Sequence, residues 1–286
     1  NFGCSARLGQ SDYFIIEADE YDTAFFDKRS KFVHYYPKTL IINNIEFDHA
    51  DIFPDIESIY LQFHHLVRCV PGSGTIITPD ADESIDKVLA MGSWTPVQRF
   101  SINENDSFWH VSFPAKDGSS FILNDPSGNS VEINWEIKGN HNIQNAVGAA
   151  VAASHTGVPF ETIAAAISKF KGVKRRLELI SGNGDILIYD DFAHHPTAIA
   201  STIETLKFSY PRNRILALIE LRSNTMRNGV HGDKLIASAK SSDAVFWYNP
   251  AGEFPGGMPD STKSSVHSEF YFEVDDLVSA VYKQVS

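Results

Sequence analysis

Apolar positions recur along the chain in two patterns, short continuous runs and helical spacing. The short runs are bounded by polar residues, which is typical of strands buried on both faces of a parallel sheet. Longer segments repeat apolar residues every three or four positions, which is typical of helices that pack on such a sheet. In the first part of the chain we expect strands at Tyr13–Ile16, Thr39–Ile42 and Thr75–Thr78, and helices at Ile59–Val70, Glu83–Met91, Asn142–His155 and Pro159–Phe170.

The pattern changes between Phe100 and Trp135, where turn sequences separate short β-rich runs. This change predicts an antiparallel patch. After Lys171–Arg176 strands and helices alternate, which predicts a smaller doubly wound domain. There we expect strands at Ile186–Tyr189, Ile215–Ile219 and Ala244–Tyr248, and helices at Thr197–Phe208, Asp233–Lys240 and Asp275–Lys283. The expected fold is α/β with two domains: 1–172, with a mostly parallel sheet, and 173–286, which is Rossmann-like.

Charge and composition narrow the classes of function. The 286 residues carry 24 Lys and Arg against 36 Asp and Glu, a net charge of −12. Such a charge argues against partners that are nucleic acids or anionic membrane surfaces. No apolar run is long enough to span a bilayer. The two cysteines, Cys4 and Cys69, are too few for a disulfide framework. We therefore expect both to be small buried hydrophobes in a cytoplasmic protein.

Two polar clusters follow predicted strands. Glu17–Asp22 contains four carboxylates, and Asn44–Asp51 contains carboxylates, amides and His49. Ligands of open α/β sheets bind beyond the carboxyl ends of strands, and hard oxygen ligands suit magnesium. Each cluster alone is also compatible with a solvated loop. Together they indicate a candidate magnesium site.

Three further clusters carry candidate chemistry. Asn142 and Asn145 share one face at the start of a predicted helix, where amides could pair with an adenine edge; Asn140 could equally be an N-cap. Lys174–Arg176 could bind phosphate or be a solvated basic face. Tyr189–Pro196 places His194 and His195 beside two aspartates, which could bind a metal, line a ribose or cap the following helix.

In this order and spacing, the five clusters resemble the Mur ligase family of ATP-dependent amide-forming enzymes. The segments that carry the resemblance are E-A-D-E-Y-D (17–22), N-I-E-F-D-H-A-D (44–51), G-N-H-N-I-Q-N (139–145), R-R-L-E (175–178) and D-D-F-A-H-H-P (190–196). L-R-S-N-T-M (221–226) is similar to a segment of one branch of the family. The resemblance covers nearly the whole chain and implies a central ATP-binding domain followed by a C-terminal Rossmann-like domain.

The resemblance implies roles at matched positions. Glu17 and His49 would bind Mg²⁺ and, with Arg176, would be the catalytic residues. Substrate contacts would come from His194, Arg222, Ser223 and Asn224, although Arg222 could instead pair with Glu220. The implied ATP-binding residues are His141, Asn142, Asn145, Arg176 and Asp191, with the asparagines at the adenine, Arg176 at the phosphates and Asp191 at the ribose.

The implied reaction joins UDP-N-acetylmuramate to the tripeptide L-alanyl-γ-D-glutamyl-meso-diaminopimelate through an acyl phosphate. ATP supplies the phosphoryl group and magnesium neutralises its charge. Three alternatives stay open: a ligase that adds L-alanine to UDP-N-acetylmuramate, a metal-dependent phosphohydrolase that uses the Asp–His clusters, and a nucleotide-binding module without catalysis.

The sequence departs from the family pattern in three places. It has no G-x-x-x-x-G-K-[ST] phosphate loop, which the family places upstream of residue 1, so we expect this chain alone to be inactive. From the resemblance we also expect the last strand of the family's C-terminal domain to be missing from this sequence. Where several branches have a modified, metal-bridging lysine, this sequence has His64 and His65.

Overall fold

Three parallel strands, β1 (Thr39–Ile41), β2 (Thr75–Pro79) and β3 (Val97–Phe100), lie side by side in that order in the first part of the protein. The computed structural model describes residues 6–23, 27–105, 108–183, 185–252, 260 and 265–285, so Cys4 lies outside the described residues. Contacts divide the chain into two units. Unit 1 is 1–47, 52–137 and 141–173, and unit 2 is 48–51, 138–140 and 174–286.

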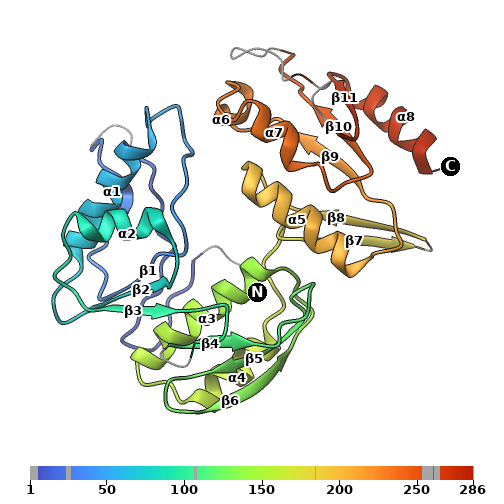
Figure 1. Cartoon of the computed structure of the whole chain (residues 1–286). Coiled ribbons are helices and arrows are strands. Elements are labelled where there is room, and N and C mark those ends of the chain that lie inside the picture. Colours follow the sequence, from blue (N-terminus) through green and yellow to red (C-terminus); the bar gives the residue numbers. More distant parts are fainter. Residues whose placement is uncertain are drawn as a thin grey trace. The chain divides into compact units, whose positions relative to one another are not determined.

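In unit 1, helices cover both faces of the parallel sheet. The short 3-10 helix η1 (Lys31–His34), α1 (Ile56–Cys69) and α2 (Glu83–Ala90) share a core with Leu40 and Ile76 on one face (Figure 1). Ile77 and Phe100 point to the other face and pack with α3 (Asn140–His155). The fully buried apolar run in β2 is explained by this double coverage.

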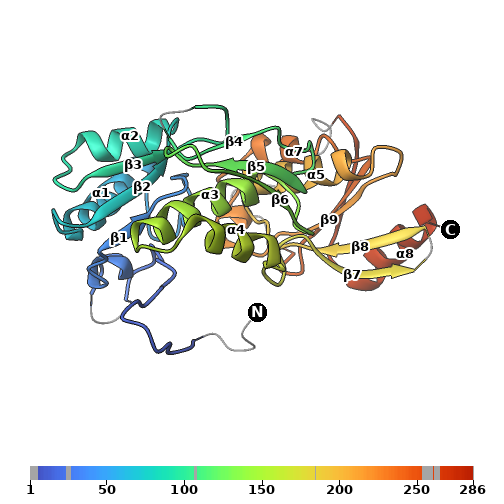
Figure 2. The same cartoon turned by 90° about the horizontal axis from the view of Figure 1, so that it is seen from below.

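The predicted antiparallel patch is present in unit 1. It consists of β4 (His110–Ser112), β5 (Ser120–Asn124) and β6 (Ser130–Asn134), paired in that order. Phe121, Leu123 and Ile133 share a core with α3 and α4 (Phe160–Lys169), and Figure 2 shows both helices against this sheet. The expected helices of unit 1 are thus all confirmed, each with bounds within about three residues of those predicted.

The expected strand at Tyr13–Ile16 is wrong. These residues form no strand, and their side chains are exposed, Ile15 to 95%. An apolar run becomes a strand only where a neighbouring strand satisfies its backbone groups. Among the described residues none pairs with this run, and the Tyr13 hydroxyl donates to the Thr156 carbonyl at 3.3 Å instead.

Unit 2 contains the predicted doubly wound arrangement. Its parallel sheet has the order β11 (His267–Tyr271), β10 (Ala244–Tyr248), β9 (Leu216–Glu220). One face packs with α5 (Pro196–Ser209), α6 (Asn224–Arg227) and α7 (Asp233–Ser238), and the other with α8 (Val274–Val285) (Figure 1). The pattern of apolar residues did not predict β11 or α6, because both are short and carry polar residues.

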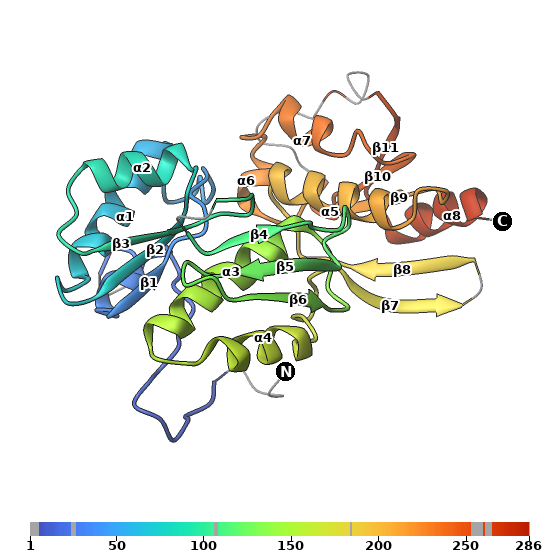
Figure 3. The same ribbon diagram turned by 60° about the horizontal axis from the view of Figure 1, so that its bottom comes forward.

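A two-stranded hairpin precedes this sheet. The strand predicted at Ile186–Tyr189 is β8 (Ile186–Asp190), but it pairs antiparallel with β7 (Glu178–Asn183) in a sheet of its own rather than with β9. Figure 3 shows the two strands side by side. Sequence periodicity identifies a strand but not its partner, which depends on long-range contacts. Among the described residues, no helix is long and apolar enough to cross a membrane.

Candidate functional site

The acidic segment 17–22 of unit 1 divides into paired and exposed carboxylates. Asp19 accepts a hydrogen bond from the Tyr21 amide at 2.9 Å and forms an ion pair with Lys31 at 3.1 Å. Asp22 pairs with Lys28 at 3.1 Å. Glu17 is exposed and forms no ion pair with any other described residue. Of these three carboxylates, Glu17 is therefore the one most available to an external cation.

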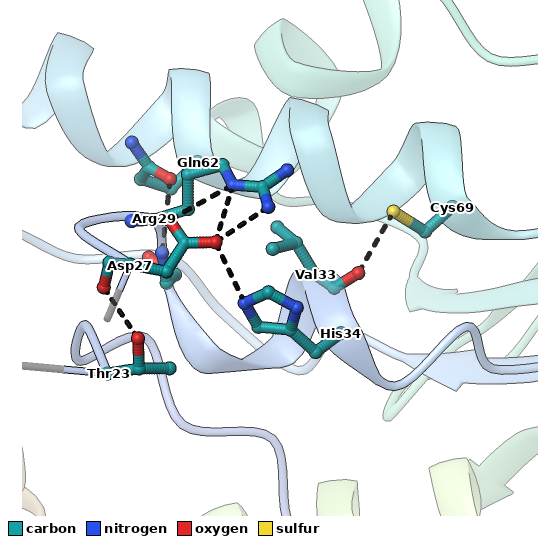
Figure 4. A network of polar contacts seen from close by, with 8 residues as sticks. Thr23, Asp27, Arg29, Val33, His34, Gln62 and Cys69 are labelled. Atoms are coloured by element: carbon teal, nitrogen blue, oxygen red, sulfur yellow. Dashed lines mark hydrogen bonds and ion pairs between the residues drawn. The ribbon is translucent and has the colours of Figure 1, made fainter.

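A polar network links residues 27–34, which follow this segment, to α1 (Figure 4). The Arg29 guanidinium donates to the Asp27 carboxylate at 2.6 Å, and His34 Nε2 lies 3.2 Å from the same carboxylate. Hydrogen bonds from Arg29 lower the pKa of Asp27 to about 2. The Cys69 thiol donates to the Val33 carbonyl at 3.5 Å, and burial raises its pKa. Cys69 is a free, half-buried cysteine, so it is less buried than expected.

The asparagines at the start of α3 face the end of β1. Asn43 Nδ2 donates to Asn145 Oδ1 at 2.8 Å, and Gln144 Nε2 donates to the Asn43 carbonyl at 2.7 Å. Asn142 Nδ2 lies 3.1 Å from His141 Nε2. Asn142 is half-buried and Asn145 is exposed. The structure thus brings His141, Asn142 and Asn145 together at one helix end, as the sequence predicted, and their amides can present donors and acceptors to a base.

His64 and His65 lie on α1, half-buried in unit 1. Both Nδ1 atoms are buried and have no hydrogen-bond partner within the described part of the chain. Burial lowers the pKa of His64. A neutral imidazole at this position cannot carry the bridging carboxylate that a modified lysine supplies in other branches of the resembled family.

Residues 48–51 belong by their contacts to unit 2, although they follow β1 of unit 1 in sequence. His49 has a φ of +55°, a conformation that is uncommon for a bulky residue. Its amide donates to Asp48 Oδ1 at 2.7 Å, and His194 Nε2 lies 3.4 Å from Asp48 Oδ2. Burial opposes ionisation of Asp48, but hydrogen bonds from His194, His49 and Thr225 outweigh it and hold its pKa below the ordinary value. The same bond to Asp48 raises the pKa of His194.

The basic segment and the second aspartate cluster form one structure in unit 2. Asp191 accepts from the amides of Leu177 and Ala193, each at 2.7 Å. The guanidinium groups of Arg175 and Arg176 lie 5.1 and 6.0 Å from the centre of the Phe192 ring. Arg176 is exposed. Sequence reasoning missed the backbone contacts of Asp191, which hold the arginine segment in place.

The remaining predicted residues of unit 2 lie at the ends of helices. His195 caps α5, since its Nδ1 accepts from the Thr197 amide at 3.4 Å, and its ring lies 4.8 Å from the ring of His231. Burial and the neighbouring His195 lower the pKa of His231. Ser223 caps α6 by accepting from the Met226 amide at 3.2 Å. Arg222 is exposed. The sequence analysis missed His231, because none of its motifs includes that position.

The donors available for a magnesium ion come from separate parts of the chain. Among the described residues, no three side chains of His, Cys, Asp or Glu gather into a metal centre. Magnesium seldom uses one: it keeps several waters and binds through one or two carboxylates and the phosphates of a substrate. The exposed carboxylate of Glu17 in unit 1 and the imidazole of His49 in unit 2 are each, taken separately, a donor that such a metal could use.

Two sequence models of one family match the chain. The Mur ligase middle domain matches residues 5–153, and the glutamate ligase domain of Mur ligases matches residues 175–286. The first match alone covers more than half of the chain and includes Glu17, His49 and the asparagines of α3. The second includes the arginine segment and the histidines that precede α5.

Curated relatives have similar sequences. The chain is 49% identical to the UDP-N-acetylmuramate–L-alanyl-γ-D-glutamyl-meso-2,6-diaminoheptandioate ligase of Haemophilus influenzae, over 87% of this chain and 55% of the relative. It is 45% identical to the ligase of the same name from Escherichia coli K12, over 99% of this chain and 62% of the relative. The chain thus spans between half and two thirds of the length of these relatives.

Solved structures agree with the sequence matches. The crystal structure of a murein peptide ligase from Psychrobacter arcticus 273-4 superposes with a TM-score of 0.70 at 42% identity, covering 96% of this chain and 59% of that one. The parallel sheets and the antiparallel patch thus lie in segments that the two domain models of this family match, 5–153 and 175–286. The chain belongs to the Mur ligase family and contains its middle domain followed by its C-terminal domain.

Proposed function

We propose that this chain is part of an ATP-dependent ligase that joins UDP-N-acetylmuramate to L-alanyl-γ-D-glutamyl-meso-diaminopimelate. The observation that carries the proposal is the 49% and 45% identity to two ligases named for these substrates, over 87% and 99% of the chain. The proposal extends to a cytoplasmic location, to magnesium as the metal, and to natural domain limits at 1–172 and 173–286.

In unit 1 we assign the nucleotide base to the start of α3. His141, Asn142 and Asn145 gather there, and the bond between Asn43 and Asn145 sets the orientation of the second amide. Glu17 is the assigned metal ligand of this unit, which its exposure and its lack of an ion pair within the described residues support.

In unit 2 we assign the phosphates to Arg176 and the ribose to Asp191. The exposed Arg176 guanidinium lies 6.0 Å from the centre of the Phe192 ring, and its planar fork of donors suits phosphate oxygens. Asp191 uses each oxygen once, for Leu177 and Ala193, and each oxygen has further acceptor capacity. His49 is the assigned metal ligand of this unit, and His194, Arg222, Ser223 and Asn224 are the assigned substrate residues.

The proposed reaction has two displacements. A carboxylate oxygen of the muramate attacks the γ-phosphorus of ATP, the bond from that phosphorus to the bridging oxygen breaks, and ADP leaves. The terminal amine of the tripeptide then attacks the acyl carbon, phosphate leaves with the electron pair of the C–O bond, and the amine loses a proton. Bound magnesium supplies positive charge for the phosphate oxygens. Arg176 adds a fixed cationic fork, so the protein acts through positioning and charge.

The test is a substrate comparison with the complete natural protein that contains this chain. Purified protein is given ATP, Mg²⁺ and UDP-N-acetylmuramate with either the tripeptide or L-alanine, and both phosphate release and the amide product are measured. The proposal requires amide formation with the tripeptide and little with L-alanine. A preference for L-alanine supports the alternative in which the enzyme adds L-alanine to UDP-N-acetylmuramate. Phosphate release without any amide supports a phosphohydrolase. Either of those results refutes the proposal.

A further inference from the structure

Helix α6 binds the segment that contains His49. The Ala50 amide donates to Thr225 Oγ1 at 3.3 Å, and Asn224 Nδ2 donates to Asp51 Oδ2 at 3.3 Å. Two of the four residues in 48–51, Ala50 and Asp51, are thus bonded to two consecutive residues of α6, and His49 directly precedes them.

Helix α6 is itself firmly anchored in unit 2. Met226 and Leu221, each 1% exposed, belong to the core that packs on the parallel sheet. Ser223 caps the helix through the Met226 amide. Thr225 is 2% exposed, so its hydroxyl has lost most of its contact with water and depends on partners in the protein. The helix therefore offers a rigid site for residues 48–51.

The backbone of His49 needs such support. A positive φ is unfavourable for a residue with a large side chain, and it persists where the surroundings determine it. Asp48 accepts from the His49 amide, and Thr225 accepts from the Ala50 amide. The bonds on either side of His49 therefore restrict the turn from which its imidazole projects.

We propose that Thr225 is a positioning residue that holds the His49 imidazole in the orientation required for metal binding. This inference rests on the proposed function, in which His49 is a metal ligand. Thr225 acts through its hydrogen bond to the Ala50 amide and does not touch the reacting atoms.

The experiment compares two buried threonines in the complete natural protein. Thr225→Val keeps the shape of the side chain but removes the acceptor of the Ala50 amide, and Thr225→Ser restores a hydroxyl. Thr205→Val is the matched control, because Thr205 is 5% exposed in α5 and does not contact 48–51. For each protein we would measure hydrogen exchange of peptides covering 47–52, Mn²⁺ affinity by electron paramagnetic resonance, and kcat and KM for the tripeptide.

We expect Thr225→Val to speed exchange in 47–52 by about fivefold, as the loss of one ordinary hydrogen bond implies. Its Mn²⁺ affinity should fall by about tenfold, as for other residues that orient a metal ligand. The value of kcat should fall while KM for the tripeptide stays unchanged. Thr225→Ser should recover most of each quantity, and Thr205→Val should match the wild type.

Unchanged exchange or unchanged Mn²⁺ affinity in Thr225→Val overturns the positioning role, and so does an equal effect in Thr205→Val. A rise in KM for the tripeptide without a change in Mn²⁺ affinity also overturns it, because α6 would then bind substrate directly. A wild-type protein that binds Mn²⁺ and forms no amide refutes the proposed function alone, since exchange and Mn²⁺ affinity still report on positioning. A wild-type protein that binds no Mn²⁺ overturns both.

Discussion

Carboxylates in the loops of this structure often bind the protein's own backbone. Asp191 binds two amides, Asp243 binds the Ile215 amide at 2.8 Å, and Asp19 binds the Tyr21 amide at 2.9 Å. The sequence shows only that such residues are acidic. The partners of a carboxylate show whether it is structural or available to a ligand. Asp19 and Asp22 have partners in the protein, whereas Glu17 is available to a ligand.

His49 should be required for catalysis but not for folding. In the complete natural protein, His49→Ala should lower kcat/KM for ligation by roughly a hundredfold or more, because a lost metal ligand withdraws charge stabilisation from the transition state. His155→Ala is the control, since His155 is exposed at the end of α3. The measurement is steady-state phosphate release at saturating Mg²⁺, with circular dichroism for the fold. Wild-type turnover in His49→Ala would contradict the assignment.

Arg222 should contribute to peptide binding. It is exposed directly after β9, and its guanidinium can hold a carboxylate with two hydrogen bonds. In the complete natural protein, Arg222→Ala should raise KM for the tripeptide about ten- to a hundredfold and leave KM for ATP unchanged, since a charged hydrogen bond is lost. Arg212→Ala, in an exposed loop, is the control. An effect on ATP alone, or on neither substrate, would exclude Arg222 from the peptide site.

Asp243 should make the stability of unit 2 sensitive to acid. Its carboxylate accepts from the Ile215 amide and from Lys207 at 3.1 Å, and these bonds, the backbone bond first, lower its pKa from the ordinary 3.8. A lowered pKa means that the stabilisation is complete above the ordinary value and is lost as the pH falls through the folded value.

We therefore expect Asp243→Asn to destabilise unit 2 by about 1 kcal/mol at pH 7, a modest value because the side chain is partly exposed. The difference from the wild type should shrink as the pH falls below the ordinary pKa. Hydrogen exchange of peptides covering 215–220 measures both quantities. Asp185→Asn, in the exposed turn between β7 and β8, should have no effect at pH 7 or at acidic pH. A difference that stays constant down to pH 3 would contradict the assignment.

At the scale of elements, local signals set where helices begin. Asp55 caps α1 by accepting from the Ser58 amide at 2.8 Å, and Asp82 caps α2 by accepting from the Ile85 amide at 2.9 Å. These bonds form within four residues, whereas apolar spacing alone placed the start of α1 at Ile59, three residues late. A strand also needs a partner, which explains the wrong strand at Tyr13–Ile16; β8 pairs with β7, the strand directly before it in the chain.

The turn between α1 and β2 provides a test of one close approach. A Cβ at Gly74 would lie 2.4 Å from the Lys38 carbonyl oxygen, whereas at Gly72 the nearest atom would be 3.8 Å away. Gly74→Ala must push β2 away from the residue that precedes β1, where the Thr75 amide donates to the same carbonyl at 2.9 Å. We expect a loss of about 1–3 kcal/mol in chemical denaturation. Gly72→Ala, the control, should be nearly neutral. Equal effects of the two substitutions would contradict the steric explanation.

At the scale of the whole molecule, this chain on its own should bind ATP weakly and not hydrolyse it. The 286 residues contain no glycine-rich phosphate loop, so no backbone cradle or loop lysine holds the β- and γ-phosphates. Isothermal titration with ATP and an assay for phosphate release measure the two properties. The complete natural protein is the positive control. ATP-dependent ligation by the purified 286-residue chain would contradict this expectation.

The sequence by itself determined the α/β class, most helices and strands, and the identity of the polar clusters. It did so because burial periodicity, helix caps and turn residues act over a few positions. It also supported membership of the family, since the five clusters carry the resemblance in order.

Only the tertiary structure decided which clusters share a unit and what each polar group binds. Residues 48–51 contact α6 and His194 across more than 140 positions of sequence. His231 meets His195 across 36 positions. Such contacts depend on how whole elements pack, and no local pattern of residues encodes them, because each is stabilised by the summed burial of side chains from many parts of the chain.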